Sequence, residues 1–377
     1  MMDIQEVREL FPYIKTGRVY FNHASSAPLS KRVLDKINHL LKNSSEGKID
    51  DFLSFLSVAG ETKKLFAGYL NTTPDTIAFG DNTTNGINLL AQGLEWRKGD
   101  RIILNDIEFP ANVYPFLNLQ QYGVEIDFLK SREGIVSAED IISNVRPETR
   151  LISISQVQFL TGYRIDLQKL GSFCRSNNII LAVDAIQGLG AFPVDVEKEQ
   201  VDFISSGTQK WMLGVQGMAF IYTSKALIEK LKPKYVGWLS VEHAWDLLNF
   251  DLVLKSNAER YQTGTVNSIG IYAANAALKL FFDFGITEIS ERVTANTVRL
   301  IKLLSEIGID PFLQNCAPSN LSGIVSFKIN DAQKVFDRLS DKMITTALRE
   351  GIIRLAPHFY NNDEDIDKVI SAVKSAV

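Results

Sequence analysis

Cysteine and histidine are scarce in this chain, which holds 2 cysteines and 4 histidines among 377 residues. Cys174 and Cys316 cannot build a disulfide framework, and no secretory signal opens the sequence, so we expect a cytoplasmic protein with free thiols. The histidines lack the spacing that is typical of metal ligands, which predicts that the protein binds no metal. They are His23, His39, His243 and His358.

Long runs of one residue type are also missing. No apolar stretch approaches the ~20 residues that cross a bilayer, so we expect no membrane-spanning helix. No long basic run occurs, and the net charge of -4 argues against nucleic acid as the main partner. Nucleotide-binding motifs are absent as well. There is no Walker loop, and Gly188 and Gly190 are followed by Pro193 where a dinucleotide fingerprint needs its third glycine.

The composition itself is that of an ordinary globular protein, 45% hydrophobic and 22% charged. Apolar strands and amphipathic helices alternate from about residue 77 to 222, which predicts an α/β fold with a mostly parallel sheet under covering helices. The pattern loosens after Gly237, and a compact α+β unit follows. We therefore predict a large domain at residues 17–254 and a small domain at 255–377, with the segment 1–16 docked on the small one.

Two predicted strands, IILAVD and VDFISSG, end beside polar side chains. The first stops on Asp184, and Lys210 follows the end of the second. Parallel neighbours would direct both groups into one crevice, where open α/β sheets bind their ligands. A carboxylate and a lysine there indicate a carbonyl cofactor, with its aldehyde on the lysine as a Schiff base and its ring nitrogen on the aspartate.

Each of these two residues has a simpler explanation. A lysine attacks a carbonyl only when unprotonated, so its pKa of ~10.4 must be lowered by burial or by a nearby cation. An ordinary surface lysine is the alternative, but the apolar Trp211, Met212 and Leu213 that follow Lys210 argue against it. An unpaired carboxylate at the end of an apolar strand is costly, so Asp184 needs a cationic partner. That partner could equally be an arginine, a lysine or the start of the next helix.

Further candidates lie in loops near predicted strand ends. Thr83 and Thr84 stand between a short strand and a helix, where backbone N–H groups bind phosphate, although simple helix capping explains them too. Phe109 follows another strand and could stack on a flat ring or simply pack in the core. Asn22 and His23 precede a helix and could line a substrate site or cap that helix.

Arg354 lies in the apolar segment GIIRLAP. An arginine there needs an anionic partner, and the planar guanidinium matches the carboxylate of an amino acid. An acidic side chain of the small domain is the alternative partner. The sequence therefore predicts either a substrate-binding arginine or a buried ion pair.

Six motifs follow one another over nearly the whole chain: DNTTNGINLLAQGL, EFPANVYPF, AVDAIQGLGAFPVDV, SSGTQKWMLG, RYQTGTVNS and GIIRLAPHFYNNDEDID. Together they resemble the class V aminotransferase family, which includes cysteine desulfurases, selenocysteine lyases, isopenicillin N epimerases and kynureninase. The resemblance implies pyridoxal 5'-phosphate as the cofactor, and the fold of aspartate aminotransferase, known as fold type I. It also implies an amino acid or a related amine as the substrate.

Carried over to matching positions, the resemblance assigns Lys210 to the Schiff base and Asp184 to the pyridinium nitrogen. Gln187 would reach the phenolic oxygen of the cofactor, and Arg354 the carboxylate of the substrate. The other cofactor contacts would come from Thr83, Thr84, Phe109, Thr208, Gln209 and Thr265. Thr265 matches a residue that reaches the phosphate bound to the partner subunit, which implies a homodimer with active sites at the interface.

Two departures from the family pattern bear on the reaction. Phe109 stands where many members have a histidine, which removes an acid–base group from above the ring. The segment from Arg349 to Arg354 has no cysteine and no room for the loop that carries the sulfur-accepting cysteine in one group of desulfurases. Transamination, racemisation at Cα and β-elimination all stay open, and we favour an epimerase-like or lyase-like enzyme over a cysteine desulfurase that uses Cys316. A cofactor-binding regulatory protein with little catalysis is the alternative from another class.

Overall fold

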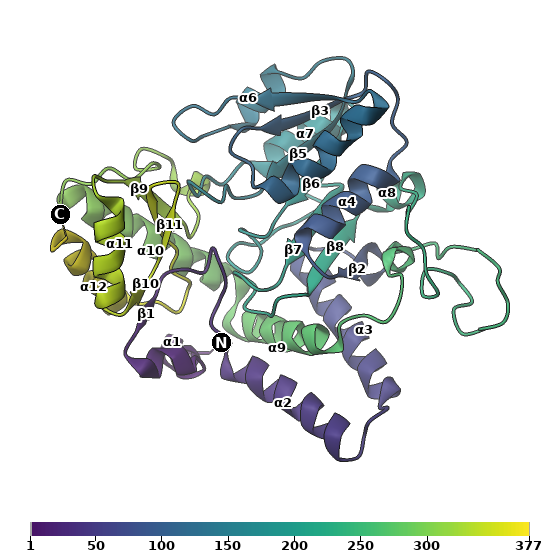
Figure 1. Ribbon diagram of the computed structural model, residues 1–377, viewed down its shortest axis with the longest axis horizontal. Helices are drawn as coiled ribbons and strands as arrows, with labels where there is room; N and C mark the ends of the chain where they lie inside the picture. The colour runs from purple at the N-terminus through teal and green to yellow at the C-terminus, as the bar shows by residue number, and fades with distance from the viewer. Residues whose placement is uncertain (1, 377) are drawn as a thin grey trace.

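The computed structural model describes residues 2–376, and its central element is a sheet of seven strands (Figure 1). In spatial order these are β2 (Ile77–Gly80), β8 (Ala219–Thr223), β7 (Phe203–Gly207), β6 (Ile180–Asp184), β5 (Thr149–Ser155), β3 (Arg101–Asn105) and β4 (Glu125–Leu129). β8 runs antiparallel to both of its neighbours, β2 and β7, and the other neighbouring pairs are parallel. The segment between β7 and β8 contains no crossover helix, so the chain returns antiparallel. The predicted mostly parallel sheet is confirmed.

Helices cover both faces of the sheet. One face packs against α4 (Thr83–Gly93), α5 (Tyr114–Leu117) and α8 (Lys225–Lys230) through one apolar cluster. The other face packs against α3 (Phe52–Tyr69), α6 (Ala138–Ser143), α7 (Leu167–Ser176) and α9 (Ser268–Phe284) through a second cluster. Successive side chains of β3 alternate between the two clusters, because Ile102 and Leu104 face the first and Ile103 the second. Burial on both faces explains why these strands read as continuous apolar runs.

A smaller unit with its own apolar core follows (Figure 1). It contains the antiparallel strands β11 (Ala347–Arg349), β12 (Ile352–Leu355) and β9 (Val325–Lys328), in that order. A second, parallel pair joins β1 (Val19–Tyr20) to β10 (Ile344–Thr345). The helices of this unit are α10 (Ile286–Glu306), α11 (Ala332–Asp341) and α12 (Asp363–Lys374).

The N-terminal segment bridges the two units. Arg8 of α1 (Ile4–Glu9) pairs with Asp365 of α12 at 2.9 Å, and Phe11 stacks on Tyr360 with ring centroids 3.9 Å apart. The chain then enters α2 (Lys31–Glu46), which packs on α9 as α3 does (Figure 1). The division at residue 254 stays a prediction, but this packing favours a later junction at Gly285, between α9 and α10. Short 3-10 turns complete the chain: Pro12–Thr16, Pro74–Thr76, Pro110–Asn112, Asn118–Tyr122, Ala258–Tyr261 and Pro318–Asn320.

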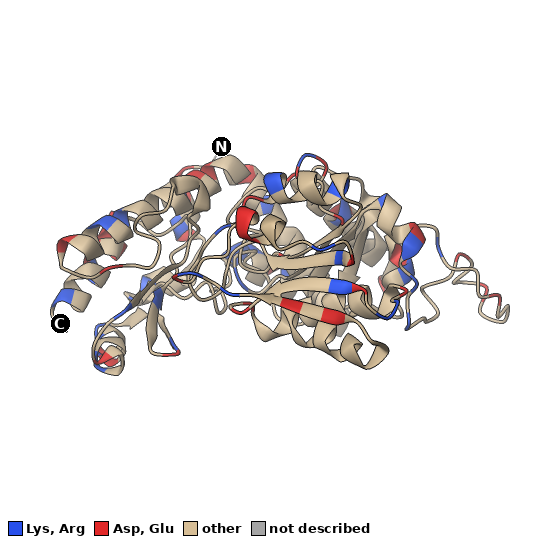
Figure 2. Ribbon diagram, turned by 90° about the horizontal axis from the view of Figure 1, so that it is seen from above, with Lys and Arg blue, Asp and Glu red and all other residues tan. Residues whose placement is uncertain are grey.

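None of the helices described between residues 2 and 376 is by itself long and apolar enough to cross a membrane. The pair α9 and α10 passes the same length and composition test only together, with a bend of 83° between them. Charged side chains of both signs are interspersed over the helices and loops (Figure 2).

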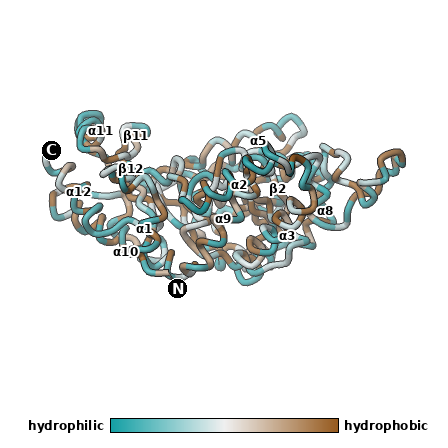
Figure 3. The backbone as a smooth tube through the Cα atoms, turned by 90° about the horizontal axis from the view of Figure 1, so that it is seen from below, coloured by the Kyte–Doolittle hydropathy of each residue, from teal (hydrophilic) through white to brown (hydrophobic). Residues whose placement is uncertain are grey.

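The irregular segment from residue 235 to 253, here called the protruding loop, extends away from the body of the molecule (Figure 1). Much of it is hydrophobic (Figure 3). Phe250 is 91% exposed and Leu248 88% exposed, and Trp238 and Trp245 pack edge to face at its base. Trp245 also contacts Phe52 at the start of α3. Such a patch on a polar surface indicates a binding surface.

Candidate active site

The carboxyl ends of β3, β5, β6 and β7 meet at one edge of the sheet, and their polar residues form a single site. Asp184 ends β6 and pairs in register with Ser205 of β7, whose chain continues to Lys210. The charges of Asp184 and Lys210 act on one another, as expected for groups that share a crevice. The strand pattern of the sequence predicted this meeting.

A rigid turn presents Lys210. The amide N–H of Leu213 donates to the Lys210 carbonyl at 3.0 Å, and Leu213 has a φ of 56°, which a branched side chain rarely adopts. Trp211 is fully buried, donates from Nε1 to Gln187 and accepts at its carbonyl from Nε2 of His358. A Cβ on Gly323 would lie 2.2 Å from the Trp211 ring, so only glycine leaves room there. These contacts fix the backbone turn that carries Lys210.

Burial lowers the pKa of Lys210 below its ordinary value. The negative charge of Asp184 partly offsets this effect, and the cations of Arg354 and Arg349 add to it. The side chain is largely buried, so water screens these effects little. A larger fraction of Lys210 is therefore the free amine near neutral pH, which is the form that attacks a carbonyl.

Asp184 is a buried carboxylate, and within residues 2–376 its side chain accepts one hydrogen bond, from the amide N–H of Ile186 at 3.0 Å. Burial raises the pKa of Asp184, and the nearby Glu108 raises it further. Among residues 2–376 no lysine, arginine or histidine forms an ion pair with it, so the alternative of a structural salt bridge is wrong. The carboxylate lacks a cation that a bound ligand can supply.

Glu108 is a site residue that the sequence did not single out. It is buried and accepts hydrogen bonds from side chains on three neighbouring segments. The donors are the side-chain amides of Asn105, Asn112 and Gln158 and both the N–H and the hydroxyl of Ser155. Its position beyond a strand, with asparagines three residues before and four after, was the available signal. The network fixes the loop that carries Phe109.

Phe109 lies at the mouth of the site and is 44% exposed, so it is not a core residue. The amine of Lys210 is 5.7 Å from the centroid of its ring. Phe159 meets the ring edge to face at 5.3 Å. A half-exposed ring above the lysine matches the predicted stacking position.

Thr83 and Thr84 open α4 beside these strand ends. The cap of α4 is Asn82, whose side chain accepts from the N–H of Asn85 at 2.8 Å, so neither threonine caps the helix. The Thr83 hydroxyl accepts from the N–H of Gly207 at 2.9 Å and joins α4 to β7. Thr84 and Phe109 line one surface hollow. The start of α4 therefore lies close enough to Phe109 to serve the same ligand.

Three predicted cofactor contacts are held by protein groups. Thr208 is buried, and its hydroxyl donates to the carbonyl of Val215 at 2.8 Å. Gln187 donates to the carbonyl of Ala24 at 3.0 Å and accepts from Trp211, which leaves one of its N–H groups available. Gln209 is held through its backbone carbonyl, which accepts from the N–H of Ala27 at 2.9 Å. Their roles toward a cofactor stay predictions.

Arg354 is buried on β12 and has no acidic partner among the described residues. Its two terminal nitrogens donate to the carbonyl of Phe159 at 2.8 Å and to the hydroxyl of Ser25 at 2.9 Å, and its Nε has no partner. Burial lowers the pKa of Arg354 to about 10, and the nearby Arg349 contributes. The predicted alternative of an ion pair within the small domain is therefore wrong, and the guanidinium is available to an anion.

The structure corrects the prediction for His23. It is fully buried, with Nδ1 2.8 Å from the carbonyl of Ala356 and Nε2 2.6 Å from the hydroxyl of Tyr360, so neither nitrogen can reach a substrate. His23 instead joins the N-terminal segment to the small unit. Asn22 is half-buried and its side-chain oxygen has no partner, so a role in substrate binding stays a prediction.

We expect the buried histidines to make the protein sensitive to acid. Burial lowers the pKa of His358 to about 4, and that of His23 well below its usual value. An unfolded chain binds their protons near pH 6.5, so stability is full above that pH and falls toward pH 4, by about 3 kcal/mol for His358 alone. Denaturant unfolding between pH 4 and 7 measures this loss.

The matched variants for this measurement are His358→Gln and His39→Gln, the latter on the exposed surface of α2. His358→Gln should flatten the decline in stability with acid, whereas His39→Gln should leave it unchanged. An equally steep decline in both variants would contradict the assignment.

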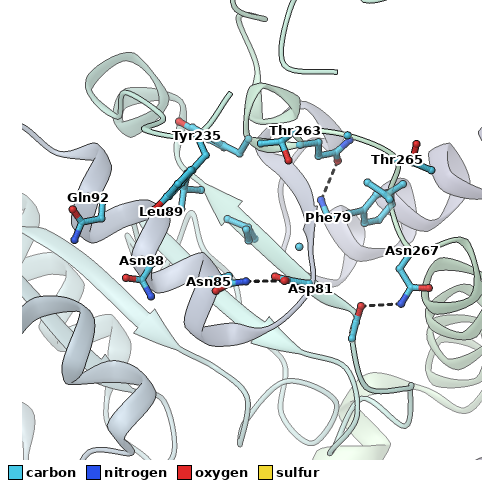
Figure 4. Close-up of a pocket in the computed structure, with 17 residues that line it drawn as sticks. Phe79, Asp81, Asn85, Asn88, Leu89, Gln92, Tyr235, Thr263, Thr265 and Asn267 are labelled. Carbon is cyan, nitrogen blue, oxygen red and sulfur yellow. Dashed lines mark hydrogen bonds between the residues drawn. The ribbon is translucent and has the colours of Figure 1, made fainter. Parts of the chain in front are cut away.

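Thr265 lies apart from Lys210, in a cavity of about 860 Å³ at the outer side of α4 (Figure 4). Asp81, Asn85 and Tyr235 also line this cavity. Figure 4 shows Asn85 donating to Asp81 at its edge, at 2.7 Å. The predicted contact of Thr265 with the partner's phosphate stays a prediction.

Neither cysteine has the features of a nucleophile. Cys174 is buried in the core, where burial raises the pKa of its thiol to about 12. Burial also raises the pKa of Cys316. Among residues 2–376, no cluster of three or more His, Cys, Asp or Glu side chains is arranged to hold a metal ion.

The sequence matches a known family and several known proteins. The model of the aminotransferase class-V family matches residues 19–369. An uncharacterized aminotransferase of Bacillus subtilis is 28% identical, over 98% of this chain and 97% of that protein. A probable cysteine desulfurase of Methanothermobacter thermautotrophicus is also 28% identical, over 97% and 96% of the two chains.

Two solved structures share the fold. A structure of C-DES with glycine covalently linked to its PLP cofactor superposes with a TM-score of 0.90, at 22% identity over 99% of both chains. A cysteine desulfurase of Thermococcus onnurineus superposes equally well, at 20% identity over 100% of this chain and 98% of that one. The predicted fold, that of the PLP-dependent enzymes of fold type I, is confirmed.

Proposed function

Because the chain belongs to the aminotransferase class-V family and is a pyridoxal-phosphate-dependent enzyme, we propose that it acts as a lyase on an amino acid with a leaving group at Cβ. The observation that supports this proposal is the combination of Lys210, Asp184 and Arg354 in one site. The lysine has a lowered pKa, the aspartate lacks a cation and the arginine lacks an anion.

The residues present fit the cofactor. A protonated ring nitrogen is the cation that the buried Asp184 needs, and Phe109 offers an aromatic face beside Lys210. Thr84 and the first N–H groups of α4 suit the phosphate. When bound through Lys210, pyridoxal phosphate supplies an electron sink for the pair of electrons left at Cα.

The protein residues bind the substrate and move its proton. Arg354 would hold the carboxylate, because its guanidinium is buried and has an Nε without a partner. Lys210, displaced by the amino group of the substrate, would take the proton from Cα as a free amine and donate it to the departing group as an ammonium. Burial raises the pKa of Asp184, so its negative charge would be stabilised by the protonated ring nitrogen of the cofactor, and Trp211 fixes the turn of the lysine.

The choice of elimination over epimerisation depends on Phe109. Inverting Cα requires a proton donor on the face opposite the base, and a phenylalanine at the mouth of the site cannot provide one. Elimination at Cβ needs only the single base Lys210. This favours the lyase within the epimerase-like or lyase-like group.

A cysteine desulfurase is the second candidate, because several relatives bear that description. It requires a thiolate that accepts sulfur from the substrate. Burial raises the pKa of Cys316, which keeps the thiol protonated, and the turn between Arg349 and Arg354 contains no cysteine.

We also propose that the protein is a homodimer. The protruding loop exposes apolar side chains that a second copy would cover, and Thr265 lines a cavity beside the start of α4. A second subunit at this cavity would bring Thr265 near the phosphate of its partner.

Reaction with β-chloroalanine tests the function. We expect one pyruvate, one ammonia and one chloride per turnover, together with exchange of the α-proton of simple amino acids for deuterium in D2O. Cys316→Ser should keep full activity, because Lys210 performs the proton transfer alone. Mass spectrometry and a coupled pyruvate assay measure these products.

Two other results would contradict the proposed lyase function. If cysteine gives alanine and sulfur bound to Cys316, and Cys316→Ser abolishes this, then the protein is a desulfurase. If the cofactor binds but no amino acid exchanges its α-proton, the chain is the cofactor-binding protein with little catalysis.

A further inference from the structure

A tight hairpin at the edge of the small unit carries two arginines. Strands β11 and β12 pair antiparallel, with Arg349 opposite Ile352 and Arg354 opposite Ala347. The turn between them consists of Glu350 and Gly351, with φ of 48° and 73°. Turns with both central residues at positive φ match the twist of a two-residue hairpin and fix its register.

The register places Arg349 and Arg354 on one face of the hairpin. Partners in a pair share a face and alternate residues share a face, so the two arginines are diagonal neighbours. Side chains at such positions start about 7–8 Å apart, within reach of one ligand for residues as long as arginine. The opposite face, with Ile353 and Leu355, packs into the core of the small unit. The arginine face is therefore the one turned toward the active site.

Arg349 has no charged partner. Its guanidinium donates only to the carbonyl of its neighbour Leu348, and it forms no ion pair with any acid in residues 2–376. Its charge lowers the pKa of both Lys210 and Arg354, as expected for a guanidinium near these two residues. No acidic side chain counters the charge of Arg354 either. Beyond Arg354 the site therefore holds a second positive charge without a counter-ion.

We propose that Arg349 binds an anionic group on the side chain of the substrate, so that the enzyme prefers amino acids with an acidic side chain. This inference rests on the proposed function. Arg354, which is buried, takes the α-carboxylate, and Arg349, which is exposed at the rim, takes the distal acid. A guanidinium suits a carboxylate because its planar fork donates two parallel hydrogen bonds.

Equilibrium binding tests the proposal on the holoprotein. Absorbance titrations with L-glutamate and L-glutamine, and with L-aspartate and L-asparagine, compare each acid with its neutral amide. Calorimetric titrations compare glutarate with butyrate. Neither of these ligands has to react for its binding to be measured. We expect the wild type to prefer each acidic ligand by roughly 10- to 100-fold, as a charge-assisted hydrogen bond provides.

The substitution Arg349→Gln should abolish this preference and leave binding of the neutral ligands unchanged. Arg97→Gln, an exposed arginine of the large unit that forms no ion pair among residues 2–376, is the matched control and should keep the preference. Equal weakening of acidic and neutral ligands in Arg349→Gln would overturn the proposal, since it would mean that Arg349 acts only through Lys210 or Arg354. Equal binding of acid and amide by the wild type would overturn it as well.

Failure of the proposed function gives a different result. If neutral amino acids exchange their α-proton as readily as acidic ones, the lyase function stands and the preference for an acidic side chain is wrong. If glutarate binds in an Arg349-dependent manner while no amino acid exchanges its proton, the anion site stands and the proposed reaction is wrong.

Discussion

Replacing Lys210 with alanine will lower turnover by at least about 10³-fold, because one side chain both binds the cofactor covalently and transfers the proton. The variant should also lose the visible absorbance band of lysine-bound pyridoxal phosphate. The fold should persist, because Trp211 and its contacts with Gln187 and His358 hold the turn independently of the lysine side chain. Absorbance spectra, turnover and thermal unfolding together measure these effects.

The control for this substitution is Lys64→Ala, which removes an exposed lysine from α3 and should change none of the three measurements. Added methylamine offers a second check, since a small free amine can replace part of the proton transfer in Lys210→Ala. Unchanged absorbance and turnover in Lys210→Ala would remove the basis of the proposed function.

The sequence was sufficient to predict the meeting of Asp184 and Lys210. Both residues lie just beyond apolar runs whose burial on both faces of the sheet follows from local composition. Parallel pairing then brings consecutive strand ends to one edge, whatever the rest of the chain does. We predicted the cofactor and the fold from the residues at this edge of the sheet and from the family motifs around them.

Other features depend on partners far along the chain and could not be predicted. His23 is bonded to Ala356, 333 residues away, and a polar loop with a histidine looks the same in sequence whether it is buried or open. The network around Glu108 joins β5 to the loop after β3, and its hydrogen bonds appear only when the strands are side by side. The packing of α9 on α2 and α3 also could not be predicted. The apolar periodicity of the sequence does not show which apolar surfaces meet.

The second large effect concerns Asp184. We expect Asp184→Asn to lower turnover by about 10²–10³-fold, the size observed when one preorganised electrostatic group is removed from an active site. An amide has nearly the shape of the carboxylate and can accept the N–H of Ile186, but it cannot keep a ring nitrogen protonated. The loss should therefore appear in the catalytic rate more than in the binding of the substrate.

The same substitution separates catalysis from folding. In the protein without cofactor, the buried carboxylate of Asp184 is unfavourable, because burial raises its pKa and, among residues 2–376, no cation forms an ion pair with it. A neutral asparagine should thus leave the unfolding temperature of the cofactor-free protein equal to or above that of the wild type. With the cofactor bound, the order should reverse, because only the carboxylate gains a partner. A variant that is less stable in both states would show that Asp184 supports the fold itself and not the cofactor.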